Sequence, residues 1–104
     1  MLPYIGIKMY ELNPSSVAEL KKGRRPFPDV ERGVLVPQVI PGSPAEKAGF
    51  AEGDVIIKFN GKDVRRSEDI YEELGHEIGK THRVEVARVG GRRILDVKTE
   101  EGIS

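Results

Sequence analysis

The 104-residue chain contains no cysteine, and its 17 basic and 17 acidic residues leave no net charge. Without cysteine there is neither a disulfide framework nor a thiolate zinc site. Balanced charge gives no global attraction to nucleic acid or to a membrane surface, and the few aromatic residues are not interleaved with basic ones as a single-strand nucleic-acid platform requires. No apolar run approaches the roughly 20 residues that a membrane span needs. We therefore expect no nucleic-acid partner and no membrane span.

The chain also lacks the residues that would make an enzyme. Nucleophilic catalysis needs a nucleophile, a base and an orienting group. Ser43 and Ser67 stand where helices begin, and no serine is flanked by glycines as in a nucleophile elbow. His76 and His82 lack the spacing of metal ligands, and we expect ordinary surface roles for both. We therefore predict an isolated non-catalytic domain with no metal and no cofactor.

What remains is the composition of one small globular domain. Hydrophobic residues make up 38% of the chain and charged residues 33%, which is typical of a globular protein. A chain of this length is large enough for a single modest core. We expect residues 1–104 to form one domain, with residues 1–3 and 101–104 as loose ends.

Local signals predict three helices and about five strands. Each helix start carries a capping residue or a first-turn proline: Asn13 and Pro14, Ser43 and Pro44, and Ser67. Strands are expected over residues 4–10, 33–40, 54–59, 83–89 and 92–99. The last two form a hairpin around Gly90-Gly91. Because strands and helices do not alternate regularly, this order predicts a small α+β domain or a partly open barrel.

Residues 4–10, Tyr-Ile-Gly-Ile-Lys-Met-Tyr, are the most informative stretch of the chain. Their alternation of apolar and polar residues indicates a half-buried strand. Gly6 interrupts the entry to this strand, where glycine is typical of a bend or of close approach by another backbone. A bent loop that runs into a strand aims successive N–H groups at one point, and between Ile5 and Ile7 that point suits a carboxylate attached to an apolar side chain. An ordinary edge strand that contains a glycine is the alternative.

Three motifs together resemble a PDZ domain. They are Tyr4-Ile5-Gly6-Ile7, then Pro41-Gly42-Ser43-Pro44-Ala45 with Ala48-Gly49, and then Gly53-Asp54-Val55-Ile56 with Asn60-Gly61. The Ser-Val-Ala-Glu-Leu helix and the following Phe27-Pro28-Asp29-Val30 make the chain similar to the PDZ domain of HtrA-family, trypsin-like serine proteases of the animal or mitochondrial type. This resemblance implies a PDZ-like, partly open barrel or sandwich of five to six strands, with two main helices and one short helix.

The resemblance also implies a peptide-binding module that recognises hydrophobic C-termini by strand addition. The carboxylate-binding loop is then Tyr4, Ile5, Gly6 and Ile7, in which the N–H groups of the last three hold the terminal carboxylate. The groove residues are Lys8, Met9 and Tyr10 on the strand and Ser67, Ile70, Tyr71 and Leu74 on the closing helix. Ile70, Tyr71, Leu74 and Ile78 recur at helical spacing as one apolar stripe, and part of this stripe serves core packing.

A second interpretation makes the chain a structural domain that docks on its own protease domain or on a partner subunit. A basic residue often precedes the carboxylate-binding loop in the family, whereas Leu2 and Pro3 stand there in this chain. The resemblance implies the regulatory, substrate-recognition part of a serine protease. It also implies the mitochondrial intermembrane space or a secreted or periplasmic compartment.

Overall fold

The computed structural model describes residues 3–23 and 26–101. Its strands are β1 (Pro3–Tyr4), β2 (Tyr10–Leu12), β3 (Gly33–Leu35), β4 (Val55–Phe59), β5 (Lys62–Asp63), β6 (Thr81–Arg88), β7 (Gly91–Lys98) and β8 (Glu100–Glu101). Its helices are α1 (Pro14–Lys21), α2 (Pro44–Ala48) and α3 (Ser67–Leu74). Within these residues no helix is long and apolar enough to cross a membrane.

Six of the strands form one antiparallel sheet that does not close on itself. Its order is β2-β3-β4-β6-β7, and β5 pairs with β4. Strands β1 and β8 form a separate antiparallel pair. The predicted α+β class, with six strands in an open sheet, two longer helices and one short helix, is confirmed.

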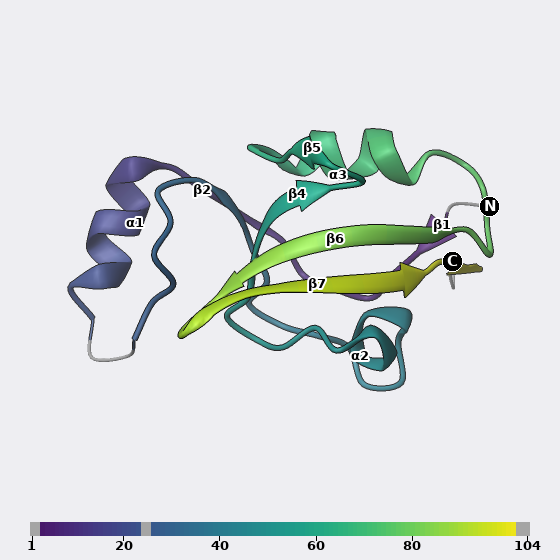
Figure 1. Ribbon diagram of the computed structural model, residues 1–104, viewed down its shortest axis with the longest axis horizontal. Coiled ribbons are helices and arrows are strands. Elements are labelled where there is room, and N and C mark those ends of the chain that lie inside the picture. The colour runs from purple at the N-terminus through teal and green to yellow at the C-terminus, as the bar shows by residue number, and fades with distance from the viewer. Residues whose placement is uncertain (1–2, 24–25, 102–104) are drawn as a thin grey trace.

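Figure 1 shows how the helices surround the long β6–β7 hairpin. The hairpin runs along the molecule, with α3 on one side and α2 on the other. Helix α1 stands at the end toward which the hairpin turn points, whereas β1 and the described end of the chain meet at the opposite end. The binding loop expected near residue 6 therefore lies far from α1.

Side-chain caps explain why the helices begin where they do. The Asn13 Oδ1 accepts a hydrogen bond from the Ser16 N–H at 2.9 Å, and the Ser43 Oγ accepts one from the Glu46 N–H at 3.2 Å. Helix α3 begins at Ser67, as predicted, and Arg66 occupies its cap position. The Asp69 carboxylate accepts hydrogen bonds from the backbone N–H groups of Arg65 and Arg66, and these bonds lower the pKa of Asp69.

The N-terminal segment corrects two expectations. The strand predicted over residues 4–10 is divided: β1 ends at Tyr4, Ile7 forms a single bridge with Val39, and β2 begins only at Tyr10. Pro3 and Glu101, expected in loose ends, are paired with each other between β1 and β8. The remaining terminal residues, 1–2 and 102–104, lie outside the described part of the chain.

Alternation along the strands divides the core into two clusters. Val34, Ile56 and Val86 join α2 and α3 in the larger cluster, which contains Ile5, Val34, Val36, Ala45, Phe50, Ile56, Phe59, Val64, Ile70, Leu74, Val84, Val86 and Val97. Their strand neighbours Val55 and Ala87 belong to the smaller cluster with Leu12, Val17 and Val30, on which Phe27 packs. The first cluster therefore supports the loop and α3, and the second supports α1.

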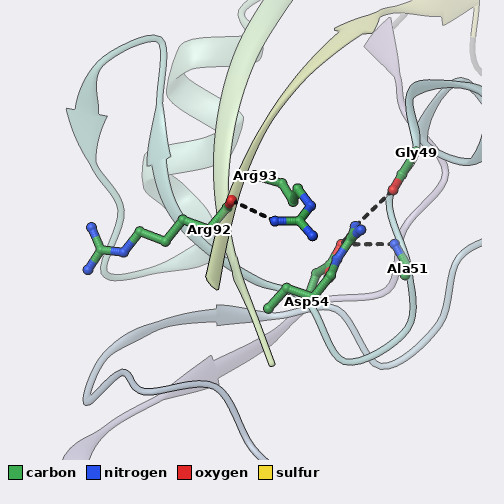
Figure 2. A network of polar contacts seen from close by, with 6 residues as sticks. Gly49, Ala51, Asp54, Arg92 and Arg93 are labelled. Carbon is green, nitrogen blue, oxygen red and sulfur yellow. Dashed lines mark hydrogen bonds and ion pairs between the residues drawn. The ribbon is translucent and has the colours of Figure 1, made fainter. Parts of the chain in front are cut away.

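A buried carboxylate ties the end of α2 to the sheet. Asp54 is 1% exposed, and its two oxygens accept hydrogen bonds from the Arg88 guanidinium at 2.8 Å each. Arg88 also donates to the Gly49 carbonyl at 2.9 Å, and the Ala51 N–H donates to Asp54. Figure 2 shows Gly49 and Ala51 beside Asp54. This network raises the pKa of Arg88 and holds the segment after α2 on the sheet.

Candidate functional site

The expected binding loop is bent at Gly6 and braced by α2. Gly6 has a φ of +86°, in the left-handed region that favours glycine. A Cβ at this position would collide with the Cβ and Oγ of Ser43. The sequence-based interpretation of Gly6 as a bend with a close approach is therefore correct, and the approaching group is the cap of α2.

Backbone hydrogen bonds set the direction of the N–H groups in this loop. The Ile5 carbonyl accepts from the Ala45 N–H at 2.8 Å, and the Gly6 carbonyl accepts from the Ile40 N–H at 2.9 Å. A trans peptide places its N–H opposite its C=O, and the described chain has no cis peptide bond. The N–H groups of Gly6 and Ile7 consequently point away from Ala45 and Ile40. Within the described residues neither donates a hydrogen bond to a carbonyl.

The backbone polar groups of the next residue, Ile7, face the open edge of the sheet. The Ile7–Val39 bridge is flanked by hydrogen bonds from Ile40 to Gly6 and from Lys8 to Gln38, the latter at 2.9 Å. In an antiparallel pair these flanking bonds leave the polar groups of the central residue on the outer side. Ile7 therefore presents its own N–H and C=O away from Val39. Because β2 is an end strand of the sheet, this outer side is the sheet edge.

Helix α3 lies beside this edge. Its first N–H, at Ser67, donates to the Glu11 Oε1 of β2 at 2.9 Å. Leu74, one of the groove residues expected from the sequence, is 5% exposed and packs in the same cluster as Ile5. Tyr71 follows Ser67 by one helical turn and so lies on the side of α3 nearer β2. These contacts place the start of α3 beside β2 and Leu74 in the same cluster as Ile5 of the loop.

The structure separates the remaining candidates by burial. Ile7 and Met9 are partly buried and pack against the large cluster, whereas Lys8 and Tyr10 are exposed. Ile70 is fully buried and serves the core. The predicted apolar stripe on α3 does not reach Ile78, which lies beyond the helix and is exposed. Tyr71, one of the expected groove residues, is 61% exposed. Ile5 and Leu74 are buried in the same cluster, Ile7 and Met9 pack against it, and Tyr71 is exposed.

A separate hollow lies away from this loop. It has a volume of about 700 Å³, and its lining includes Leu20 of α1, Phe27, Pro37 and Val89 near the β6–β7 turn. None of its lining residues belongs to the expected loop or to α3. The expected groove between the loop and α3 is thus distinct from this hollow.

A polar chain behind α3 was not predicted. Lys62 Nζ donates to Glu73 of α3 at 2.9 Å, Asn60 Nδ2 lies 3.4 Å from the same carboxylate, and Asn60 Nδ2 lies 2.9 Å from His82 Nδ1. His82 is fully buried, so its predicted surface role is wrong. The signal was present in β6, where the period of two puts His82 on the inward face of Val84 and Val86.

Contacts within this hydrogen-bonded series shift the pKa values of its ionisable groups. The hydrogen bond from Lys62 lowers the pKa of Glu73. Burial, the largest cause, and the nearby Lys80 lower the pKa of His82, while Glu73 and Glu77 act in the opposite direction. Among the residues described, no cluster of three histidine or acidic side chains forms a metal-binding group.

Comparison with known protein families identifies the fold to which this loop belongs. Residues 3–99 match the model of the PDZ domain family. The chain belongs to this family. A Do-like protease of Arabidopsis thaliana is 51% identical over 100 residues, which are 95% of this chain and 22% of that protein. The mitochondrial serine protease HTRA2 of Bos taurus is 49% identical over 71 residues, 68% of this chain and 16% of that protein.

Solved structures agree with this assignment. The crystal structure of the HtrA3 PDZ domain bound to a phage-derived ligand, FGRWV, is 33% identical, with a TM-score of 0.82 over 94% of this chain and 86% of that one. The HtrA-type protease AlgW with a decapeptide has a TM-score of 0.80 over 99% of this chain and 30% of that one, at 19% identity, and shows the shared fold.

This PDZ domain is homologous to the PDZ domains of HtrA-family serine proteases, as its motifs predict. It is a non-catalytic module, in agreement with the missing catalytic residues. The chain spans about a fifth of the length of the curated relatives named above.

Proposed function

We propose that this PDZ domain binds the C-termini of peptides or protein tails that end in an apolar residue. The N–H groups of Ile5, Gly6 and Ile7 donate to the terminal carboxylate, and the peptide adds as a strand beside residues 7–10. The observation that carries this proposal is the direction of the Gly6 and Ile7 N–H groups, which point away from their neighbours and are unused within the described residues. Converging backbone donors form an anion site without a charged side chain.

The preference for an apolar last residue rests on the surroundings of the loop. Ile5 and Leu74 supply an apolar floor, and the partly buried Ile7 and Met9 flank it. A ligand side chain seated there exchanges water for apolar contact, which contributes about 25 cal/mol for each Å² buried. The ligand in the HtrA3 structure, FGRWV, ends in valine and supports the same preference.

In the longer protein, we propose that the domain is the substrate-recognition part of a serine endopeptidase. The curated relatives that it matches are proteases, and the domain accounts for about a fifth of their length. The competing arrangement, in which the groove packs on a protease domain, predicts no binding of free peptide to the isolated domain.

Backbone NMR of ¹⁵N-labelled protein tests the proposal. We expect FGRWV with a free C-terminus to shift the amide signals of Gly6 and Ile7 most strongly, since their protons enter hydrogen bonds to the carboxylate. Shifts centred instead on Leu20 and Val89 would place the peptide in the hollow beside α1. An unchanged spectrum at saturating peptide would favour the docking arrangement.

A further inference from the structure

The buried ring of His82 is linked through one side chain, Asn60, to helix α3 of the proposed groove. The ring packs against Phe59, with ring centroids 5.3 Å apart, and it is wholly inaccessible to solvent. Its Nδ1 lies 2.9 Å from Asn60 Nδ2. Its Nε2 is buried, with no hydrogen-bond partner in the part of the chain that the structure describes. A buried polar atom without a partner is costly, so this arrangement is sensitive to change.

The protonation of this ring follows from the orientation of the Asn60 amide. The Arg83 N–H donates to Asn60 Oδ1 at 3.0 Å, which fixes that end of the amide as the oxygen. The other end is therefore Nδ2, which only donates, so His82 Nδ1 accepts and Nε2 carries the proton. The resting state of His82 is the neutral Nε2–H tautomer.

The same amide connects His82 to α3. Asn60 Nδ2 also faces Glu73 Oε1 at 3.4 Å, and the second oxygen of Glu73 is held by Lys62 at 2.9 Å. Glu73 lies in the last turn of α3, next to Leu74 on the groove floor. The position of α3 is consequently coupled to the hydrogen bond between Asn60 and His82.

We propose that Asn60 and Glu73 are positioning residues, and that a proton on His82 Nδ1 breaks their chain and loosens α3, so that acidification weakens peptide binding. The binding part of this inference rests on the function proposed above. A doubly protonated ring presents an N–H to the Asn60 N–H groups, and two donors repel. Rotating the amide by half a turn does not restore the contacts, because it sets Nδ2 against the Arg83 N–H and Oδ1 against the Glu73 carboxylate.

The charged groups around the ring help to determine the pH at which His82 gains its second proton. Helix α3 contributes Glu73, and the segment between α3 and β6 contributes Glu77 and Lys80. Both carboxylates favour the proton and Lys80 opposes it, while Lys62 neutralises much of the Glu73 charge. Strand β7 places the apolar Val97 opposite His82. Burial makes the largest contribution and lowers the pKa of His82, so the transition lies below the ordinary value of 6.5.

Two measurements on the same protein test this. In the absence of peptide, NMR follows the His82 ring and the backbone amides of Tyr71, Glu73 and Leu74 from pH 7.5 to 5. We expect the three α3 amides to titrate with the midpoint of the His82 ring. Amides that stay still while the ring titrates would overturn the proposal, as would a ring that stays neutral throughout. This arm does not depend on peptide binding.

The second arm measures the affinity for FGRWV by calorimetry over the same pH range. If the protonated form does not bind, the affinity falls about tenfold one pH unit below the pKa of His82. His82→Gln, whose side-chain oxygen accepts from Asn60 without titrating, should remove this dependence. The exposed His76 is the matched control, and His76→Gln should preserve it. A pH dependence that persists in folded His82→Gln would contradict the proposed coupling between His82 and α3. Absence of binding at every pH would instead contradict the proposed function. The NMR measurement would still show whether α3 responds to the protonation of His82.

Discussion

Gly6 lies directly against Ser43, and this contact joins the N-terminal loop to the start of a helix 37 residues further along the chain. Ser43 caps α2 through its Oγ, and the first turn of α2 also holds the Ile5 carbonyl. The outward direction of the loop N–H groups is thus a consequence of packing on α2. Any change that displaces α2 should therefore also displace the loop.

Gly6→Ala should destabilise the domain by more than Gly42→Ala. Both glycines have a positive φ, so alanine costs about 1–2 kcal/mol at either position. Only at Gly6 does the added methyl group meet Ser43, whereas the space around Gly42 is open. Thermal unfolding checks this, and equal losses for the two variants would show that the Gly6–Ser43 contact is not tight. Lost peptide binding in Gly6→Ala alone therefore does not identify a ligand contact.

Tyr71→Ala should weaken peptide binding while leaving the stability nearly unchanged. Tyr71 is 61% exposed and lies on the side of α3 nearer β2, so its ring is available to a ligand. We expect a loss of about 1–2 kcal/mol, or roughly five- to thirtyfold in affinity. Glu72→Ala, the exposed next residue, is the control and should have little effect. Calorimetry with FGRWV distinguishes them, and similar affinities for the two variants would remove Tyr71 from the groove.

Arg88→Met should be strongly destabilising, because it leaves the buried Asp54 carboxylate without its cation. Breaking a buried ion pair on one side costs about 3–5 kcal/mol. Arg83→Met is the matched change in an exposed pair, with Asp96, and should cost at most about 1 kcal/mol. Urea unfolding measures both free energies. A small loss in Arg88→Met would show that water or another donor replaces the guanidinium at Asp54.

The free energy of unfolding should fall as the pH drops below about 6.5. Burial lowers the pKa of folded His82, so the unfolded chain binds its proton first and acid favours unfolding. The contribution is complete above pH 6.5 and is lost down to the pKa of the folded state, with a slope of at most about 1.4 kcal/mol per pH unit. Urea unfolding of the wild type and His82→Gln at pH 7.5 and 5.5 measures the difference. Equal pH dependence in both proteins would exclude this contribution.

Local signals predicted the helix starts and the hairpin, because caps and turns are settled within a few residues. Asn13 and Ser43 each cap a helix by accepting a hydrogen bond from the backbone N–H three residues later in the chain. Asn60 adopts a left-handed φ of +52° in the tight turn that is typical of an Asn-Gly dipeptide. For the same reason Gly6 was identified as a bend from the sequence alone.

The predictions were wrong where the structure depends on contacts between residues that are far apart in the sequence. The alternation over residues 4–10 is correct for burial but did not reveal that Ile7 pairs only with Val39, so that β2 begins later. Helical spacing grouped Tyr71 with Ile70 but did not fix which residues of α3 face the core. The roles of the site residues remain predictions, because direction and burial describe a site without measuring its ligand.

The central claim is that the loop binds a terminal carboxylate, and the most direct test compares FGRWV with its C-terminally amidated twin by calorimetry. Each charge-assisted hydrogen bond to the carboxylate contributes roughly 1.5–3 kcal/mol. Amidation removes the charge while keeping the side chains, so we expect the affinity to fall about tenfold or more. Equal affinities for the two peptides would contradict the assignment of the carboxylate to Ile5, Gly6 and Ile7.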